Sequence, residues 1–557
     1  MQERLNISFA QYNNCVGAFD ENARHAALAF EQAQAAGSDL LIFPEMYLCG
    51  YPCEDLAYRR DFYDAQMTAM AVLAALTAPA TNKTAMIIGG IRHDEQGKIY
   101  NSLFLLDDGK ITHIRDKVEL PNYGVFDEKR IFTKGANKGP LNFRGLRIGF
   151  IICEDIWGDE VVPCLAETGA QLVIACNASP YEQDKAEHRL QRALGLAVEF
   201  ELPIIYFNAI GGQDELVFDG GSFAVSPQNE GGADLVWQAP WFAPDLQQLE
   251  FHLLESGRVQ LNKQENPLIK PLDQMAQIHS AIRLGLQDYI AKNGFKGVLL
   301  GLSGGIDSAL TFALCVDALG AERVKAIYMP SPYSADSSFE DADLQAKLLG
   351  CNLDILPIDH GMQMVQTLLS PALPDGATGI AAENIQARLR GLMLMTLSNQ
   401  LGLMVVTTGN KSEIATGYST LYGDACGSFN LLKDLYKSDV FALSNWLNQQ
   451  GLHQQSAGMI IPQRVIDKPP SAELSPNQKD SDSLPDYALL DAILYDRIER
   501  NLTKAELIQI HKDSAAIDQA LKLLKNSEYK RRQAAPGVKL SSCSFGRDWR
   551  YPITNHY

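Results

Sequence analysis

The sequence lacks an apolar run of about 18 residues, and its first residues, MQERLNISFAQYN, lack a basic segment followed by an apolar core. The first absence argues against a membrane-spanning helix, and the second argues against a secretory signal peptide. Internal repeats and low-complexity tracts are also missing. The nearest to one is a stretch rich in Pro, Ser and Asp at 469–487, which predicts a mobile loop and not a core element. We therefore expect a cytoplasmic protein built from ordinary folded domains.

Patterns typical of disulfide frameworks and zinc sites are missing as well. The ten cysteines are scattered along the chain, which is typical of buried or catalytic thiols in a reducing compartment. Cys49 and Cys53 are close in sequence, but no second closely spaced cysteine pair and no paired histidine accompanies them. A metal site at these two cysteines is therefore not expected.

Basic residues are few relative to acidic ones, 48 against 67, so the formal net charge is −19. Such a chain does not offer a non-specific surface for nucleic acid or for anionic membranes. An anionic substrate is still allowed, because Lys, Arg or Mg²⁺ inside a cleft sets the local potential. With 557 residues, 46% hydrophobic and 21% charged, the composition is that of a globular protein long enough for two domains.

A glycine-rich loop within 297–310, GVLLGLSGGIDSAL, organises the second half of the chain. The apolar run 298–302 predicts a buried parallel strand and a helical pattern begins at Ala309, so SGGIDS is a strand-to-helix turn. Free N–H groups and the helix dipole at such a turn favour an anion, for which phosphate is the obvious choice. No Gly-Lys pair follows Gly304 and Gly305, which excludes the GxxxxGK[ST] loop. An ordinary glycine-rich turn is the alternative, but the loop resembles the pyrophosphate loop of ATP pyrophosphatases.

The first half alternates apolar runs with helical patterns, which predicts an α/β domain. The predicted strands are 6–10, 40–43, 86–89, 148–152, 172–175 and 204–207, and the predicted helices are 20–36, 54–78 and 182–201. Glu45, Lys117 and Cys153 each come just after a strand. Strand ends on one edge of a sheet can bring such side chains together.

These three residue types together can hydrolyse an amide. A free thiol is only about 3% ionised at pH 7, so Cys153 needs a base or a positive neighbour. We expect Glu45 to take the thiol proton and pass it to the departing amine, while Lys117 and the backbone N–H of Glu154 stabilise the oxyanion. The products would be a thioester and ammonia, after which water releases the acid. Each residue alone has a plain structural explanation, such as a buried small thiol or a solvated charge, but their joint occurrence favours catalysis.

The segments that carry these residues resemble the nitrilase superfamily. They are FPE at 43–45, DKVELPNYGVFDEKRIF at 116–132 and CEDIW at 153–157. The resemblance covers nearly the whole first half and implies an αββα sandwich with a Glu-Lys-Cys triad. It implies that Glu128 supports the lysine of the triad and belongs to the glutamine site. It also implies that glutamine is bound by Tyr51, Tyr123, Phe126, Glu154, Ser179 and Lys185.

Strands and helices alternate in the second half too. The predicted strands are 298–302, 324–329, 353–358 and 403–407, and the predicted helices are 275–290, 308–319, 338–349 and 380–400. This alternation predicts a doubly wound parallel sheet with ligands at the strand C-termini. Asp307 and Glu413 would lie near one sheet edge and could hold Mg²⁺ between triphosphate oxygens. Capping of a helix N-terminus is the alternative for either carboxylate alone.

Seven segments of the second half resemble the NAD synthetases: SGGIDS, MPSPYS, ENIQARLRG, TTGNKSE, YGDACGSFNLLKDLYKSDV, IPQRVIDKPPSAEL and the tail KRRQAAPGVKLSSCSFGRDWRYPI. With the nitrilase-like half in front, the whole chain resembles the glutamine-dependent NAD synthetases. The resemblance implies that ATP is bound by Ser303, Gly304, Gly305, Ile306, Asp307, Ser308, Ser331 and Thr408. It places Arg388 near the nucleotide. Arg388, Asp424 and Lys437 would together form the site for deamido-NAD. The resemblance also implies a homo-oligomer.

We predict three parts in the chain: a nitrilase-like glutamine amidohydrolase domain at 1–258, a linker at 259–274 and an NAD synthetase domain at 275–557. The linker prediction rests on a polar stretch with two prolines and no periodicity. The expected reaction converts deamido-NAD, ATP, glutamine and water into NAD, AMP, pyrophosphate and glutamate. Ammonia released at the first site would attack an adenylylated deamido-NAD at the second.

Two other functions stay open from the sequence. The same chemistry could act on a different carboxylate or carbonyl acceptor, as in other ATP pyrophosphatases, although the tail and ENIQARLRG argue against this. A binding or scaffold protein that kept both folds is the other possibility. The intact set Glu45, Lys117, Cys153, Asp307 and Glu413 argues against it, and a turnover assay decides.

Overall fold

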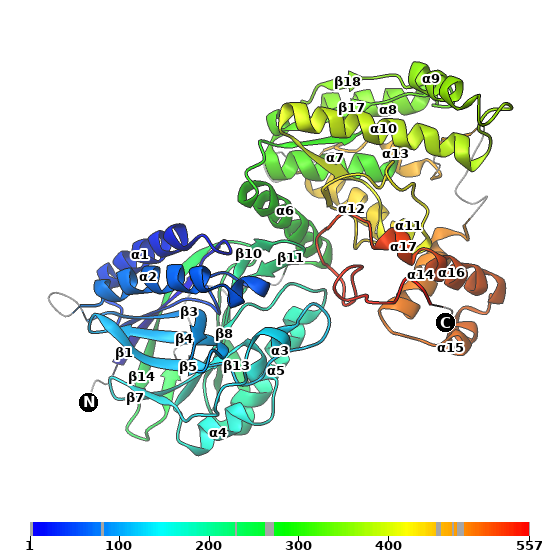
Figure 1. The fold of residues 1–557 in the computed structure, drawn as a ribbon. Coiled ribbons are helices and arrows are strands. Elements are labelled where there is room, and N and C mark those ends of the chain that lie inside the picture. Colours follow the sequence, from blue (N-terminus) through cyan, green and yellow to red (C-terminus); the bar gives the residue numbers. More distant parts are fainter. Residues whose placement is uncertain are drawn as a thin grey trace. The chain divides into compact units, whose positions relative to one another are not determined.

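The structure is a computed structural model that describes residues 4–78, 83–228, 231–261, 272–452, 458–470, 473–475 and 484–555. The chain divides into two compact units, Met1–Leu272 and Asp273–Tyr557 (Figure 1). Most of the loop predicted at 469–487 and ten residues of the predicted linker, 262–271, lie outside the described residues. The predicted domain boundaries therefore stay a prediction.

Two β-sheets form the first unit. One has the strand order β15-β14-β1-β2-β3-β4-β5, and the other has the order β13-β12-β9-β8-β7-β6. The strands of the first sheet are β1 (Arg4–Gln11), β2 (Leu40–Ile42), β3 (Ala85–His93), β4 (Ile99–Asp107), β5 (Lys110–Asp116), β14 (Asp245–Leu253) and β15 (Val259–Leu261). Those of the second are β6 (Leu141–Phe143), β7 (Leu146–Ile152), β8 (Leu172–Asn177), β9 (Ile204–Asn208), β12 (Phe223–Pro227) and β13 (Ala233–Gln238). A separate hairpin pairs β10 (Ile210–Gln213) with β11 (Leu216–Asp219).

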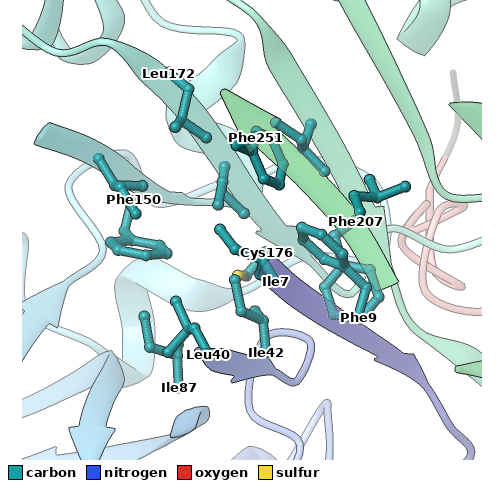
Figure 2. Close-up of a cluster of buried hydrophobic side chains, with 14 of the residues drawn as sticks. Ile7, Phe9, Leu40, Ile42, Ile87, Phe150, Leu172, Cys176, Phe207 and Phe251 are labelled. Atoms are coloured by element: carbon teal, nitrogen blue, oxygen red, sulfur yellow. The ribbon is translucent and has the colours of Figure 1, made fainter. Parts of the chain in front are cut away.

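An apolar core fills the space between these two sheets. Because side chains alternate along a strand, Ile7 and Phe9 of β1 point to the same face, where they meet residues of the second sheet (Figure 2). The rings of Phe9 and Phe207 lie 5.3 Å apart in an edge-to-face arrangement. Burying each such side chain contributes about 1.5–3 kcal/mol, so this packing holds the two sheets face to face.

Helices cover the outer face of each sheet. Helices α1 (Phe19–Ala35) and α2 (Arg60–Leu76) share a buried cluster with the first sheet, and α4 (Val161–Glu167) and α5 (Lys185–Phe200) share another with the second. The resulting layers are helix, sheet, sheet and helix, which confirms the αββα sandwich. Shorter elements of this unit are η1 (Glu54–Tyr58), α3 (Glu128–Ile131) and η2 (Cys153–Ile156).

The sheets of the first unit are mixed, and some of their strands were not predicted from the sequence. Strands β3, β4 and β5 form an antiparallel meander, and β1 pairs antiparallel with β14. The short strand β15, at Val259–Leu261, pairs with β14, so the first sheet continues three residues into the stretch predicted as a linker.

A single sheet of five strands, all paired in parallel, organises the second unit in the order β18-β17-β16-β19-β20. The strands are β16 (Val298–Gly301), β17 (Val324–Tyr328), β18 (Leu353–Ile355), β19 (Met404–Thr407) and β20 (Phe429–Asn430). The predicted parallel sheet is confirmed. The strand predicted at 353–358 ends at Ile355, two residues before Pro357, which has no N–H to donate to a ladder.

Helices surround this sheet and extend beyond it. They are α6 (Gln274–Lys292), α7 (Ile306–Leu319), α8 (Asp336–Leu348), α9 (Asp359–Leu369), α10 (Ile380–Leu401), α11 (Lys411–Thr416), α12 (Lys437–Gln450), α13 (Gln463–Asp467), α14 (Tyr487–Ile498), α15 (Lys504–His511), α16 (Ser514–Asn526) and α17 (Glu528–Arg531), with the short η3 (Ala321–Arg323). Helix α7 is buried along almost its whole length. Helices α14 and α16 build a separate apolar cluster with α11. Within the described parts of the chain, no helix has the length and apolar character needed to cross a membrane.

Candidate active sites

A buried lysine between two carboxylates lies at the strand ends of the first unit. Lys117 follows β5 directly, and its Nζ donates to Glu45 Oε1 and to Glu128 Oε1 at 2.8 Å each. All three side chains are almost fully buried. Burial alone lowers the pKa of Lys117, but the charges of Glu128 and Glu45 outweigh it, so this pKa is raised well above its usual range. The lysine is therefore a permanent cation at this site.

The Glu45 carboxylate is held from three directions. In addition to Lys117, Asn101 Nδ2 donates to Oε1 at 2.7 Å and the backbone N–H of Ala178 donates to Oε2 at 2.7 Å. Asn101 comes from β4 and Ala178 follows β8, so the two sheets fix this carboxylate together. Because both of its oxygens are hydrogen-bonded, the Glu45 carboxylate is held in one orientation.

Cys153 lies at the end of β7, where the chain turns into η2. Its φ of 46° is in the left-handed region, which is uncommon for a residue other than glycine. The thiol is buried, and burial raises its pKa well above the usual range, with Glu45 adding to this rise and Lys117 opposing it. The environment of Cys153 thus favours the protonated thiol, which is a weaker nucleophile than the thiolate.

Asp155 ties the Cys153 turn to the Lys117 turn. Its Oδ2 accepts from the N–H of Ile152 at 3.0 Å, and its Oδ1 accepts from Val118 and Glu119 at 3.0 and 2.7 Å. Burial raises the pKa of Asp155 to about 6, and these backbone donors oppose that rise. Asp155 was not among the predicted site residues, although it lies within the CEDIW segment.

The residues predicted to bind glutamine gather around this cluster to differing degrees. Tyr51 OH donates to Glu128 Oε1 at 2.9 Å, and Tyr123 OH donates to the Glu154 carboxylate at 3.1 Å. Tyr123 is exposed, whereas Tyr51 is buried. The remaining predicted residues are Phe126, whose ring lies 5.8 Å from Lys185 Nζ, and Ser179, which is buried beside Arg189.

The glycine-rich loop of the second unit closes on itself through two serines. Ser308 Oγ and Ser303 Oγ lie 3.0 Å apart, and Ser308 Oγ donates to the carbonyl of Gly305 at 2.9 Å. Gly304 has a φ of 81°, and a Cβ there would stand 2.3 Å from the carbonyl oxygen of Ser338. Only glycine fits this position, so the loop packs directly on the start of α8. The loop leads into α7 as predicted, but this helix begins at Ile306, three residues before the predicted start at Ala309.

The carboxylates predicted to hold a metal both contact one cation. Lys437 Nζ pairs with Asp307 Oδ2 and lies 3.4 Å from Glu413 Oε1, and it is almost fully buried. Asn410 Nδ2 donates to Asp307 Oδ1 at 2.8 Å. Glu413 Oε2 also accepts from the Asn410 N–H at 3.3 Å in a capping box. One oxygen of Glu413 therefore caps the helix N-terminus, while the other contacts Lys437. Two separate sheet-end carboxylates thus converge on a single positive charge.

The other residues predicted for the second site lie in varied surroundings. Ser331 is buried and its Oγ accepts from the N–H of Tyr333 at 3.3 Å, and Thr408 is half-buried just after β19. Arg388 is exposed on α10 and donates to the carbonyl of Leu421, and Asp424 is exposed and accepts from the N–H of Thr420. Lys437 is the one of this group that contacts Asp307 and Glu413 directly.

Two different family models match the two halves of the chain. A family model described as carbon-nitrogen hydrolase matches residues 6–250, and one described as NAD synthase matches residues 278–534. A glutamine-dependent NAD(+) synthetase of Acinetobacter baylyi is 40% identical over 99% of this chain and 98% of its own length. The enzyme of that name from Rhodobacter capsulatus is 41% identical over 100% and 99%. A solved structure of the synthetase of Acinetobacter baumannii with ADP covers 99% of both chains at 39% identity with a TM-score of 0.77.

The fold and the two polar clusters define a two-domain protein, a carbon-nitrogen hydrolase followed by an NAD synthase domain. Sequence identity near 40% over the full length of several relatives then identifies the family within this class. The chain belongs to the family of glutamine-dependent NAD(+) synthetases.

Proposed function

We propose that the protein makes NAD from deamido-NAD, ATP and glutamine, releasing AMP, pyrophosphate and glutamate. The observation that carries this proposal is the presence of a complete polar cluster in each unit of a chain from this family. One cluster is Glu45, Lys117 and Glu128 beside Cys153, and the other is Asp307, Glu413 and Lys437. The first suits amide hydrolysis and the second suits binding of a nucleoside triphosphate.

Glu45 acts as the base for Cys153 in the first site. Because the pKa of the buried thiol is raised, attack on the glutamine carboxamide requires proton transfer to Glu45 as the carbon-sulfur bond forms. Lys117, a permanent cation, stabilises the negative oxygen of the tetrahedral intermediate together with the N–H of Glu154. Glu45 then gives its proton to the leaving ammonia, and water hydrolyses the thioester to glutamate.

The second site adenylylates the carboxylate of deamido-NAD. The loop of Ser303, Gly304 and Gly305 leads into the N-terminus of α7, where the first N–H groups of the helix and its dipole favour the phosphates of ATP. Deamido-NAD attacks the α-phosphorus and pyrophosphate leaves, after which ammonia displaces AMP. Arg388, Asp424 and Lys437 stay the proposed contacts of the dinucleotide.

Asp307 and Glu413 are proposed to hold Mg²⁺ with the triphosphate. They fit this ion because they are hard oxygen ligands that already converge on one cation, Lys437 Nζ. Among the described residues, no group of three or more His, Cys, Asp or Glu side chains could hold a metal by itself, and phosphate oxygens and water would supply the other ligands. When bound, Mg²⁺ supplies positive charge to the triphosphate oxygens.

We also propose a cytoplasmic location and self-association. The location is supported by the ten cysteines, which are all free thiols. Self-association rests on the resemblance to the two families.

Product analysis tests the proposed function. The protein is incubated with glutamine, ATP, Mg²⁺ and deamido-NAD, and the products are identified by mass spectrometry. We expect NAD, AMP, pyrophosphate and glutamate in equal amounts. Stoichiometric ADP would contradict adenylylation, and turnover with another acceptor but not with deamido-NAD would favour the alternative ligase function.

A further inference from the structure

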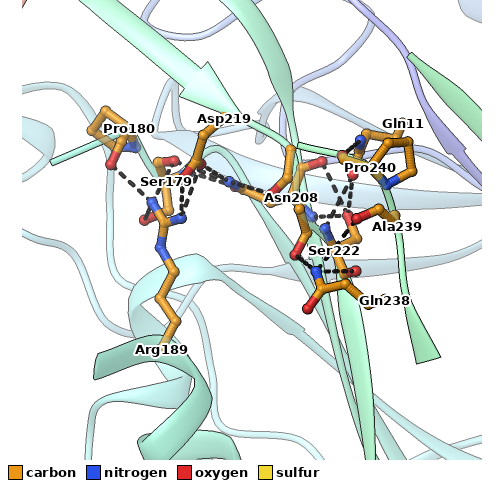
Figure 3. Close-up of polar contacts among 12 residues, drawn as sticks. Gln11, Ser179, Pro180, Arg189, Asn208, Asp219, Ser222, Gln238, Ala239 and Pro240 are labelled. Carbon is orange, nitrogen blue, oxygen red and sulfur yellow. Dashed lines mark hydrogen bonds and ion pairs between the residues drawn. The ribbon is translucent and has the colours of Figure 1, made fainter. Parts of the chain in front are cut away.

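A buried arginine next to the first site has no role in the chemistry described above. Arg189 comes from α5 and is 2% exposed. Its Nη1 donates to both oxygens of Asp219, at 2.9 and 2.8 Å, and its Nη2 donates to the carbonyls of Ser179 and Pro180 at 3.0 and 2.8 Å (Figure 3). The same Nη2 donates to Ser179 Oγ at 3.0 Å. The planar guanidinium therefore binds one carboxylate and one turn of the backbone at once.

Asn208 holds the same turn from the neighbouring strand. Its Oδ1 accepts from the N–H of Ser179 at 3.0 Å, and its Nδ2 donates to the carbonyl of Ser179 at 3.1 Å and to Asp219 Oδ1 at 2.9 Å. The N–H of Asn208 in turn donates to Ser222 Oγ, which donates to Gln11 Oε1 at 2.7 Å (Figure 3). The turn at Ser179 is thus connected through side chains to both sheets.

This turn carries a direct contact to the catalytic base. Ala178, the residue before Ser179, donates its N–H to Glu45 Oε2. Burying the charges of Arg189 and Asp219 is costly, and the buried Arg189 Nε has no hydrogen-bond partner among the described residues. An apolar pair of similar volume would serve packing at least as well. What the arginine does contact is the turn that carries the Ala178 N–H.

We propose that Arg189 is a positioning residue of the glutaminase site, which holds the turn at Ala178–Pro180 so that Glu45 faces Cys153 in its reactive orientation. The inference rests on the proposed glutaminase activity. Arg189 acts through the turn and through Glu45. Asp219 binds the Arg189 guanidinium, and Asn208 bonds the same turn. Together they hold Ser179, a proposed contact of the amino-acid head of glutamine.

The main variant is Arg189→Lys, which keeps the charge and loses the planar fork. A lysine cannot bond Asp219 and two carbonyls at these positions together, so the turn shifts and Glu45 loses its fixed orientation. We expect the glutaminase kcat to fall about 10–100-fold per active site, as for other supporting residues of catalytic groups. The rate of Cys153 alkylation by iodoacetamide, followed by peptide mass spectrometry, should fall in parallel because it also needs the base.

Three controls separate positioning from folding. The first is the matched variant Arg144→Lys, whose guanidinium binds the carbonyl and carboxylate of Asp39 just before β2, at the opposite end of that strand from Glu45. It should keep the wild-type kcat. The second is NAD synthesis from added ammonium, which Arg189→Lys should leave unchanged. The third is titration of active sites, which counts the folded fraction, so a lower kcat cannot arise from unfolded protein.

A double-mutant cycle tests the path through Glu45. In a Glu45→Gln background, Arg189→Lys should change the alkylation rate less than twofold, because the base it positions is already gone. If Arg189→Lys lowers the alkylation rate by the same factor in the wild-type and Glu45→Gln backgrounds, the proposal is overturned. If Arg189→Lys does not fold, Asn208→Ser removes two bonds to Ser179 without leaving a buried charge, and a wild-type kcat in that variant would also overturn it. An inactive wild-type protein would instead contradict the proposed function.

Discussion

Cys153, the proposed nucleophile, depends strongly on its neighbours. Burial raises the pKa of its thiol, so the sulfur alone is a poor nucleophile at pH 7. Glu45 and Lys117, whose charges act on the thiol in opposite directions, come from the other sheet of the sandwich. The reactivity of this residue is therefore a property of the pair of sheets.

Replacing Cys153 by Ala should separate the two reactions. We expect Cys153→Ala to abolish the glutaminase activity, by at least about a thousandfold, and with it NAD synthesis from glutamine. Synthesis from added ammonium should stay near the wild-type rate, because the second unit has its own sheet and its own polar cluster. Cys164→Ala, a half-buried thiol of α4 in the same unit, is the matched control and should be fully active. Loss of the ammonium-driven reaction in folded Cys153→Ala would show that the two sites are not separate.

Glu128 should give the glutaminase reaction a pH dependence near neutrality. Burial raises the pKa of Glu128 to about 7, while Lys117 opposes the rise and Glu45 adds to it. Below this pKa the carboxyl is protonated and no longer a charged partner for Lys117. We therefore expect kcat/KM for glutamine to increase with pH up to about 7, at most tenfold per unit, and then to level off.

The variant Glu128→Gln assigns this pH limb. The amide cannot ionise, so the limb near pH 7 should disappear and the plateau should fall about 10–100-fold, because Lys117 loses one of its two charged partners. Tyr51→Phe, which removes the other donor to Glu128 Oε1 but no charge, should keep the limb. An unchanged limb in Glu128→Gln would mean that another group titrates there.

At the scale of elements, the site residues follow the ends of strands in both units. Glu45, Lys117 and Cys153 come after β2, β5 and β7, and Asp307 and Glu413 come after β16 and β19. This pattern is visible in the sequence because apolar runs mark the strands and the reactive residues follow them. It explains why the sequence predicts these five positions without a structure.

The turn from β16 into α7 offers a test at this scale. Gly304→Ala places a Cβ 2.3 Å from the Ser338 carbonyl and adds the strain of a positive φ. The glycine-rich loop, which is proposed to bind phosphate, must then move away from α8, so we expect AMP formation to fall at least about 100-fold while glutaminase activity stays. Gly350→Ala is the matched control, because its φ is 69° but nothing lies within 4 Å of the added Cβ. Equal losses in both variants would mean that backbone strain, and not the close approach, determines the effect.

Other contacts could not be predicted, because they join segments that are far apart in the sequence. Arg189 and Asp219 are 30 residues apart, and neither belongs to a recognisable motif. Lys411 of the TTGNKSE segment is buried against Asp434 at 2.8 Å and the carbonyl of Cys543 at 2.9 Å, 132 residues away. A charged residue is predicted from the sequence to be exposed, because the partner that allows its burial is identified only in the folded structure.

At the scale of the whole molecule, the two units have separate cores and separate sites. Each sheet system carries its own buried cluster of charges, and the proposed reactions share only ammonia. Ammonia released into neutral water is mostly protonated, and ammonium has no lone pair with which to attack an adenylate. A chain that couples the two reactions efficiently has to keep the ammonia from equilibrating with solvent.

Isotope transfer measures this coupling directly. Glutamine labelled with ¹⁵N in its amide is supplied with deamido-NAD, ATP and Mg²⁺ in an excess of unlabelled ammonium, and the mass of NAD is measured. If ammonia passes between the sites without leaving the protein, NAD carries the label well above the isotope ratio of the bulk. The variant Cys153→Ala, which uses only ammonium, sets the unlabelled baseline in the same mixture.

Binding of deamido-NAD and ATP should also accelerate glutamine hydrolysis, because uncoupled hydrolysis would waste glutamine. Label in NAD at the bulk ratio would show that ammonia equilibrates with water, and the two units would then be joined in sequence only.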